Sequence, residues 1–317
     1  YGYGELSVPI VSPAQGIRWI DRLNASAALR FEHYPGIDDV VTPKLGLIYA
    51  PIADLAFKAN WGRSCRAPTL QQQYLVQSAL LYNATTVGGT TGKAIILTGG
   101  NPDLKPERAS TWTATLAFTP SKIPGLSLQL GYFSTRYTDR IVTPIGYFSQ
   151  SLSNPLYAPY VVRNPGVAAA QAAVDNSVTL YNATTTPFDP ADIAAIVRNT
   201  SVNAGNQRLR GIDFLADYAG DLGEGNGSLA LSVNASYLKS SQTLIEGAAP
   251  TQLAGTLFNP PHWRGRASAT WSVDGLSLNA TASRVGPVED QRTATIIPVH
   301  GQTTLDVTAR YAFPQEQ

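Results

Sequence analysis

The sequence has few charged residues, one cysteine and no methionine. Charged residues make up 14% of the 317 residues, whereas roughly 25% is usual for soluble domains. The single cysteine, Cys65, excludes a disulfide framework and a cysteine-rich metal site. A net charge of +1, without any run of Lys and Arg, argues against nucleic-acid binding. These shortages suit a protein whose surface does not face bulk water everywhere.

Long hydrophobic runs are also missing, since no stretch approaches about 18 consecutive apolar residues, so no transmembrane helix is predicted. Membrane barrels carry a weaker signal, made of alternating segments of about ten residues. Such alternation is present: Leu55, Phe57 and Ala59 are interleaved with Lys58 and Asn60. About eleven segments of this kind, joined by alternately short and long connections, predict an all-β fold built as an antiparallel barrel portion.

Two long connections interrupt the strand pattern, at approximately residues 67–105 and 142–205. The first opens with Arg66-Ala67-Pro68 and closes with Asn101-Pro102-Asp103-Leu104-Lys105-Pro106-Glu107. Proline cannot donate a ladder hydrogen bond and Asn-Pro favours a turn, so strand pairing is expected to stop near each element. The second closes with Arg210-Gly211-Ile212-Asp213, from which another alternating segment continues.

These elements, in this order and at this separation, resemble the barrel of TonB-dependent outer-membrane receptors. In that family an Arg-Ala-Pro strand end leads into a long extracellular loop, and Asn-Pro-x-Leu-x-Pro-Glu announces the next strand. The resemblance covers nearly the whole chain, except that Cys65 stands where the family more often has an aromatic residue. It assigns a structural role to nine motif residues: Arg66, Ala67, Pro68, Asn101, Pro102, Leu104, Pro106, Glu107 and Gly211.

The resemblance implies a portion of a barrel of about 22 strands, with short periplasmic turns and long extracellular loops. Residues 1–317 then form a partial barrel domain, from which the family's plug and the last hairpin are absent. The implied function is TonB-dependent active uptake of a scarce nutrient, an iron–siderophore or saccharide-type ligand, across the outer membrane of a Gram-negative bacterium. The expected partners are this ligand at the extracellular loops, outer-membrane lipid, and TonB through the plug, with the receptor a monomer.

Charge decides which side of the strands would face lipid. An Arg or Lys at mid-depth on the lipid side costs about 2–4 kcal/mol. The side that carries Arg30, Lys58, Asp217, Asp306 and Arg310 is therefore expected to line the channel. The Leu, Val and Ala side is expected to face lipid, with aromatic residues near the strand ends.

Patterns for catalysis and for bound cofactors are missing. Gly62-Arg63-Ser64-Cys65-Arg66 lacks the second glycine of a nucleophile elbow, and residues 87–93 lack the first glycine of a phosphate loop. His33, His262 and His300 lie far apart in the sequence, without metal-ligand spacing. The chain is therefore expected to be neither an enzyme nor a metal or cofactor binder.

The long loops carry the candidate binding residues. Leu81-Tyr-Asn-Ala-Thr-Thr86 recurs identically at residues 180–185, which predicts either a shared loop habit or paired ligand contacts through Tyr82 and Tyr181. Aromatic rings with neighbouring Asn, Gln and Thr suit neutral or ring-bearing ligands. The candidate ligand-binding residues are the six loop tyrosines Tyr74, Tyr82, Tyr147, Tyr157, Tyr160 and Tyr181.

Two short helices are predicted to brace the second loop. Residues 166–175 form one, and Phe188–Arg198 forms the other, with Asp189 as N-cap and Pro190 at the first position.

Two further functions stay open at this point. A soluble β-rich carbohydrate-binding protein would show the same alternation with its leucines facing inward, between two layered sheets. An outer-membrane barrel enzyme such as a lipase would need a Ser–His pair at one site, which the sequence does not indicate.

Overall fold

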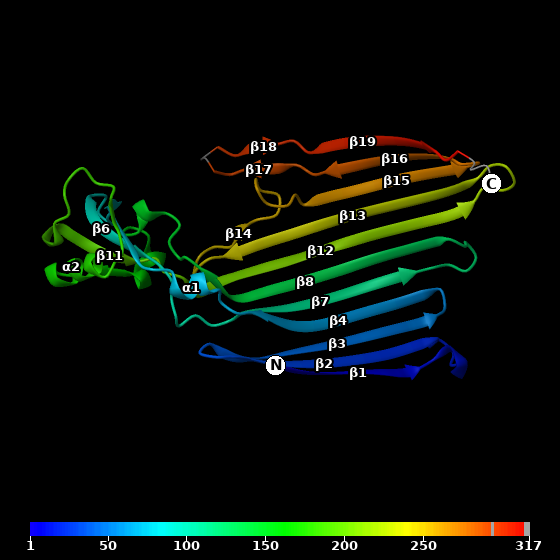
Figure 1. Cartoon of the computed structure of the whole chain (residues 1–317), viewed down its shortest axis with the longest axis horizontal. Helices are drawn as coiled ribbons and strands as arrows, with labels where there is room; N and C mark the ends of the chain where they lie inside the picture. Colours follow the sequence, from blue (N-terminus) through cyan, green and yellow to red (C-terminus); the bar gives the residue numbers. More distant parts are fainter. Residues whose placement is uncertain (293–294, 314–317) are drawn as a thin grey trace.

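Eleven strands form one continuous antiparallel sheet, here called the main sheet (Figure 1). The structure is a computed structural model that describes residues 1–292 and 295–313. In spatial order the strands are β1 (Gly2–Val11), β2 (Arg22–Tyr34), β3 (Asp38–Ile52), β4 (Leu55–Arg66), β7 (Glu107–Phe118), β8 (Leu126–Val142), β12 (Val202–Asp221), β13 (Ser228–Thr243), β15 (Trp263–Val273), β16 (Leu276–Val285) and β19 (Gln302–Tyr311). The predicted antiparallel arrangement of about eleven strands is confirmed.

Tight turns join the strands at one end of the main sheet, here called the turn end. The connection between β15 and β16 is only two residues long, and its Gly275 has a φ of 82°. A Cβ there would lie 2.7 Å from the carbonyl oxygen of Ala312, so the turn requires glycine. The two longest connections, from β4 to β7 and from β8 to β12, leave from the opposite, loop end, as the sequence predicted (Figure 1).

The register gives the main sheet one polar and one apolar face. Directly paired residues of an antiparallel sheet share a face. On one face, Asn60 pairs with both Gly46 and Thr113. On the other, Phe57 pairs with Leu116, which pairs in turn with Leu130. The alternation in the sequence therefore sorts the side chains by polarity across the whole width of the sheet.

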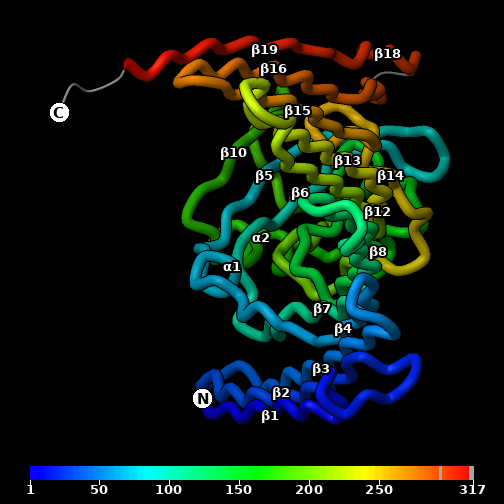
Figure 2. Tube along the Cα trace, turned by 90° about the vertical axis from the view of Figure 1, so that its right-hand side faces the viewer, coloured from blue at the N-terminus to red at the C-terminus, as the bar shows by residue number. Residues whose placement is uncertain are grey.

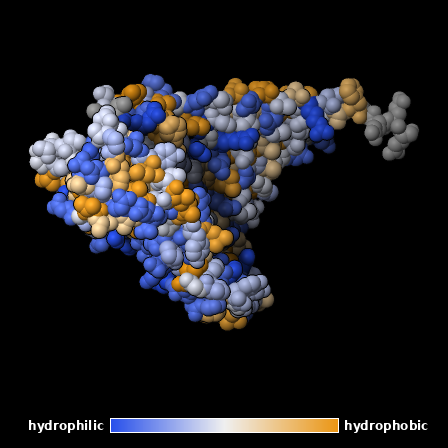
Figure 3. Space-filling model, turned by 60° about the vertical axis from the view of Figure 1, so that its left-hand side comes forward, coloured by the Kyte–Doolittle hydropathy of each residue, from blue (hydrophilic) through white to orange (hydrophobic). Residues whose placement is uncertain are grey.

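The main sheet curves into a trough rather than closing on itself, and β1 and β19 are its two edges (Figure 2). Polar side chains shield one another on the inner face, where Thr281 is 4% exposed. Leu305, on the apolar face, is 69% exposed. Figure 3 shows hydrophobic side chains along the outer edge over β16 and β19, with hydrophilic ones toward the hollow. No second sheet covers the leucines in the described part of the chain.

The two long loops fold together into a domain at the loop end of the trough, here called the loop domain (Figures 1 and 2). Its five-stranded sheet has the order β10-β5-β6-β11-β9. The first loop supplies β5 (Ser78–Thr85), β6 (Thr91–Thr98) and helix α1 (Leu70–Tyr74); the second supplies β9 (Val161–Arg163), β10 (Leu180–Asn182), β11 (Ile193–Arg198) and helix α2 (Val167–Asp175). Both joints between the loops, β5 with β10 and β6 with β11, are parallel.

Unlike the main sheet, the loop domain has a buried core on each face of its sheet. On one face Tyr82, Ile96 and Val197 pack against Ile145 and Leu152. On the other face the residues that pack together are Ala79, Leu81, Ile95, Leu97, Ala170, Ala173, Ile193 and Ile196, of which Ala170 and Ala173 belong to α2. Because these short strands are covered on both faces, their sequences are continuous apolar runs and do not alternate between polar and apolar residues.

One of the two predicted helices is correct and the other is largely wrong. Helix α2 spans Val167–Asp175, within the predicted residues 166–175, and Gly166 is its N-cap. The segment Phe188–Arg198 holds only a 3-10 turn, Pro190–Asp192, and then becomes strand β11. Asp189 does cap the turn, because its side chain accepts a hydrogen bond from the Ala191 backbone N–H at 2.9 Å. The apolar residues from Ile193 onward gain more by pairing with β6 and β9 than a short helix would offer.

Smaller elements complete the loop end. Strand β14 (Thr251–Gln252) pairs with β13, and β17 (Val288–Asp290) pairs with β18 (Ile297–Val299). The 3-10 turns η2 (Phe148–Gln150) and η3 (Pro155–Tyr160) also lie at this end, whereas η1 (Pro13–Gln15) connects β1 with β2 at the turn end. Among the described residues, no helix is long and apolar enough to cross a membrane.

Candidate functional site

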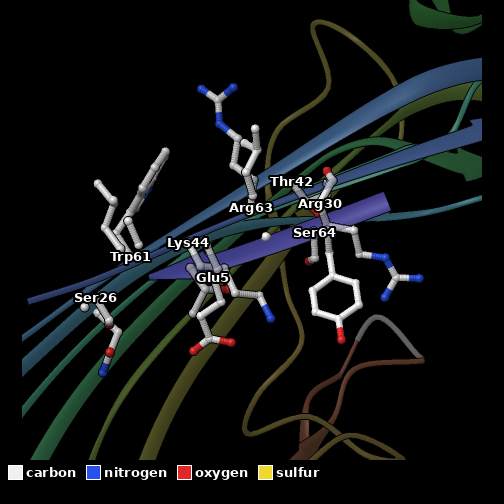
Figure 4. Close-up of a pocket in the computed structure, with 18 of the residues that line it drawn as sticks. Glu5, Ser26, Arg30, Thr42, Lys44, Trp61, Arg63 and Ser64 are labelled. Carbon is white, nitrogen blue, oxygen red and sulfur yellow. Dashed lines mark hydrogen bonds between the residues drawn. The ribbon is translucent and has the colours of Figure 1, made fainter. Parts of the chain in front are cut away.

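The polar face of β1–β4 carries charges of both signs. The register places Glu5 opposite Ala28, and Ala28 opposite Lys44, so these side chains share the inner face. Figure 4 shows Glu5 and Lys44 on one side of the sheet, with Trp61 and Arg63 on the other. Arg30 forms an ion pair with Glu32 at 2.6 Å. A hollow of about 890 Å³ runs along these strands, and its lining includes the charged side chains of Glu5, Arg30, Glu32 and Lys44 beside apolar ones.

Glu107 ties together the loop end of three neighbouring strands. One of its carboxylate oxygens accepts a hydrogen bond from Arg66 Nε at 2.8 Å, and the other accepts one from the Ile141 backbone N–H at 2.8 Å. Arg140 donates to the side chain of Gln207 nearby, and these residues border a hollow of about 350 Å³ at the channel rim. The buried Glu107 thus links β4, β7 and β8 where both long loops begin or end.

Asparagine side chains fasten the loop domain to this rim. Asn203 accepts from the Lys105 N–H and donates to the Lys105 carbonyl, both at 2.8 Å. Asn199 makes the same two-way contact with Ile145, at 2.9 and 3.1 Å. Asn101 donates to the carbonyl of Ser201 at 3.0 Å. Each contact joins a residue of one loop stem to another stem, because an amide can replace a missing strand partner.

The other motif residues occupy the same rim. Pro68, Leu104 and Pro106 are buried there, whereas Ala67 is half-buried and Pro102 is exposed. Gly211 lies within β12, where a Cβ would meet the Tyr237 carbonyl oxygen at 2.3 Å and the Phe133 ring at 2.6 Å. Packing and hydrogen bonding hold several of these residues in place, and the structural role of the whole motif stays a prediction.

The six candidate tyrosines divide into exposed and buried groups. Tyr74, Tyr147 and Tyr181 are exposed, and Tyr160 is half-buried. Burial raises the pKa of Tyr160, and the nearby Glu246 raises it further. Tyr82 and Tyr157 lie in the loop-domain core. A ligand cannot reach these two side chains in this conformation, so the structure argues against direct contact with either.

The repeated hexapeptide places its two tyrosines in different surroundings. Tyr82 is 6% exposed, and its hydroxyl lies 2.6 Å from the Ser151 hydroxyl. Burial raises its pKa, and the bond to Ser151 only partly offsets this. Tyr181 is 68% exposed on the edge strand β10. The two copies are adjacent but staggered, since Tyr181 pairs with Leu80 and not with Tyr82.

The stagger forms an apolar hollow at the edge of the loop domain. Tyr181 pairs with Leu80, and Leu80 pairs with Ile96, so the three share one face of the sheet. Phe148 joins them from η2 and packs edge-on against Tyr82, with ring centroids 6.3 Å apart. The hollow has a volume of about 460 Å³, which is within the usual size range of small-molecule sites. Tyr74 and Tyr147 are not among its lining residues.

Sequence reasoning missed this hollow and part of the rim. Leu80 and Ile96 appear in the sequence as ordinary apolar residues, and only the pairing of the two loops brings them beside Tyr181 and Phe148. The rim contact between Arg140 and Gln207 is equally non-local. Cys65 is a half-buried free thiol, with its sulfur 3.8 Å from a Glu32 carboxylate oxygen.

In the described ranges 1–292 and 295–313, no group of three or more His, Cys, Asp and Glu side chains could hold a metal ion.

Comparison with known proteins identifies the architecture. The sequence profile of the family described as "TonB dependent receptor-like, beta-barrel" matches residues 1–317. Among proteins with curated descriptions, no sequence matches this chain.

Similar solved structures are receptors of Gram-negative bacteria. For the siderophore receptor PirA from Acinetobacter baumannii the TM-score is 0.64 at 15% identity, covering 98% of this chain and 39% of that one. For a mutant of the ferric enterobactin receptor PfeA from Pseudomonas aeruginosa the TM-score is 0.57 at 17% identity, covering 92% of this chain and 35% of that one. For the FrpB iron transporter from Neisseria meningitidis the TM-score is 0.53 at 14% identity, covering 92% of this chain and 36% of that one. The chain thus spans little more than a third of these receptors, and the likeness at this identity concerns the fold.

Proposed function

The chain belongs to the TonB-dependent receptor β-barrel family, and on that premise we propose that it supplies channel wall and ligand-receiving loops to a receptor that imports a scarce nutrient. The family is one of transport receptors in the outer membrane of Gram-negative bacteria, so this chain is an outer-membrane protein. A soluble carbohydrate-binding protein is not supported, because the leucines lie on an uncovered face instead of between two sheets.

The observation that carries the proposal is the trough with its capped mouth. Its inner face is polar and charged and its outer face is apolar. The loop domain lies across the loop end (Figures 1 and 2). In this arrangement lipid faces Phe57, Leu116 and Leu130, while solutes pass Glu5 and Lys44. Edge strands β1 and β19 would each pair with further strands in the whole barrel of about 22 strands.

The ligand is expected to dock at the apolar hollow between Phe148 and Tyr181. Two aromatic rings and two aliphatic side chains favour a ring-bearing ligand, such as an aromatic iron–siderophore complex, over a small ion. A saccharide, which also stacks on aromatic rings, is the second ligand class. Ligand binding would then be passed on to the plug and to TonB in the whole receptor, while the barrel itself catalyses nothing.

Growth and binding experiments with the whole receptor test this function. A receptor-deleted strain that carries the gene is supplied with single ferric siderophores or saccharides as its iron or carbon source. The proposal expects growth on at least one of these ligands and saturable binding of the same ligand by the purified receptor. Failure of every ligand in both classes would contradict the proposed function.

Variants of the hollow test the docking site separately. Phe148→Ala and Tyr181→Ala are each expected to weaken binding roughly tenfold, since an aromatic contact contributes about 0.5–1.5 kcal/mol beyond its buried area. Tyr74→Ala is the matched control, because Tyr74 is equally exposed but lies outside the hollow. Equal affinity in all three variants would remove the hollow as the ligand site and leave the transport function standing.

A further inference from the structure

The apolar face of the main sheet ends, toward the loop end, in a row of tryptophans followed directly by arginines. Trp61 pairs with Trp112, and their rings lie 6.0 Å apart. Two residues further along the strands, Arg63 pairs with Ser110, and Ser110 pairs with Arg136. Directly paired residues share a face, so Arg63 and Arg136 project from the lipid side of the barrel. Figure 4 shows Arg63 on the same side of the sheet as Trp61 and opposite Lys44.

The cationic row continues across four strands. Arg136 pairs with Arg208, and one row lower Ser134 pairs with Arg210, which pairs with Lys239. Arg108 lies one row higher, opposite Cys65 and Thr138. We call these six exposed cations the outer basic cluster, and its members are Arg63, Arg108, Arg136, Arg208, Arg210 and Lys239.

Few negative charges of the protein lie close enough to neutralise the outer basic cluster. Across the described ranges, the one carboxylate within ion-pair distance of any member is Asp38, 3.2 Å from Arg108. Arg63 lies over the Trp61 ring and Lys239 over the Tyr237 ring, both at 5.7 Å, so these two heads stay close to the aromatic row. Six like charges with one partner repel one another and attract anions from outside.

Three members surround a concavity. Arg63, Arg108 and Arg136 line a hollow of about 310 Å³ together with Ser110 and Thr138. Three guanidinium groups and the hydroxyls of Ser110 and Thr138 provide many N–H and O–H donors, and the one carboxylate in ion-pair distance, Asp38, engages Arg108 alone. Planar guanidinium groups bind phosphate oxygens in pairs, so this donor set suits a phosphate group.

We propose that the outer basic cluster binds the phosphorylated headgroup of a lipid in the outer leaflet. The cluster continues the lipid-facing surface, and it begins where the apolar band and its aromatic border end. A phosphate at that height is attached to acyl chains that cover Trp61, Trp112 and the leucines below. One lipid molecule therefore pairs with the cations through its headgroup and covers the apolar side chains with its acyl chains. A free phosphate ion can only do the first.

The test uses the purified whole receptor in neutral detergent. Its melting temperature is measured as a phosphorylated lipid, a neutral lipid with the same chains, or inorganic phosphate is added. The triple variant Arg63→Gln, Arg136→Gln, Arg208→Gln is compared with an inner-face triple, Arg30→Gln, Lys44→Gln, Lys58→Gln, which removes the same charge. The parent and the inner-face triple are expected to be stabilised by the phosphorylated lipid alone.

The outer triple is expected to bind that lipid roughly a hundredfold more weakly, since each surface cation near an anionic leaflet contributes about 1 kcal/mol. If this triple fails to fold, the single variants Arg136→Gln and Arg136→Lys replace it, with about fivefold loss for Gln and little for Lys. Equal binding by the outer and inner triples, or by Arg136→Gln and the parent, would overturn the proposal. Equal stabilisation by the neutral lipid or by inorganic phosphate would overturn it as well.

Discussion

The main sheet and the loop domain are both built of β-strands, but they place their apolar residues in opposite ways. The loop domain covers both faces of its sheet with its own side chains, and Leu81 is completely buried. The main sheet leaves Leu130 and its neighbours uncovered and turns its polar residues inward. A strand sequence therefore does not fix what its leucines contact. The surrounding medium completes the structure of the main sheet, while the loop domain is complete in itself.

The largest effect is expected from a cavity made in the core of the loop domain. Leu81→Ala is expected to destabilise the loop domain by about 2–5 kcal/mol, because a fully buried leucine loses its packing and leaves a void. Leu130→Ala, on the lipid side of β8, is the matched control and is expected to cost much less. Protease cleavage within residues 67–205 of the folded receptor measures the difference. Equal protection in both variants would contradict a separate loop-domain core.

A charge placed on either face of one strand tests which side of the main sheet meets lipid. Phe214 lies in the apolar row beside Leu130, whereas Leu215 lies beside Gln129 and Asn234 on the inner face. Phe214→Arg is expected to destabilise the barrel by about 2–4 kcal/mol in a bilayer, and Leu215→Arg by much less. Unfolding by urea in lipid vesicles compares the two. A larger loss for Leu215→Arg would reverse the assignment of the faces.

The smallest effect concerns Tyr82, the copy of the repeated tyrosine that the loop domain buries. Tyr82→Phe leaves the Ser151 hydroxyl without its partner and is expected to cost about 1 kcal/mol at neutral pH. The raised pKa of Tyr82 favours the neutral phenol in the folded state. Its contribution to stability is therefore present below the ordinary value of 10.0 and is lost as the pH rises through the folded pKa.

Protease protection of the loop domain from pH 8 to pH 12 measures this dependence. The parent is expected to lose protection more steeply than Tyr82→Phe at alkaline pH. Tyr181→Phe is the control, because it removes the same hydroxyl from the other copy of the repeat, where the side chain is exposed on the edge strand β10. Identical pH profiles for the parent and Tyr82→Phe would show that Tyr82 does not titrate in a buried site.

The main sheet could be predicted from the sequence because its information is local. Alternation such as Leu55, Phe57 and Ala59 fixes both the strand and its faces, and Pro68 and Asn101-Pro102 mark its ends. The loop domain could not be predicted in the same way. Its joints pair residues about a hundred positions apart, as in Tyr181 with Leu80, and no local signal encodes them. The run from Ile193 to Val197 is also too short for its periodicity to separate a buried strand from a helix.

The candidate site shows the same limit. The sequence predicted that the loop tyrosines bind ligand, and Tyr181 is exposed enough for a ligand to reach it. Identical local sequence placed Tyr82 in a core instead, because the stagger between β5 and β10 gives the two copies different neighbours. The rim motif was easier to place, since Glu107 and Asn101 act on strand ends that the sequence already marks.

The parallel joints between the two long loops have a mechanical consequence. Strand β5 from the first loop is hydrogen-bonded to β10 from the second, and β6 to β11. Neither loop can move away from the other without breaking the hydrogen bonds of these two strand pairs. The two loops are therefore expected to move together, as one body held on four chain segments, whenever either of them is displaced.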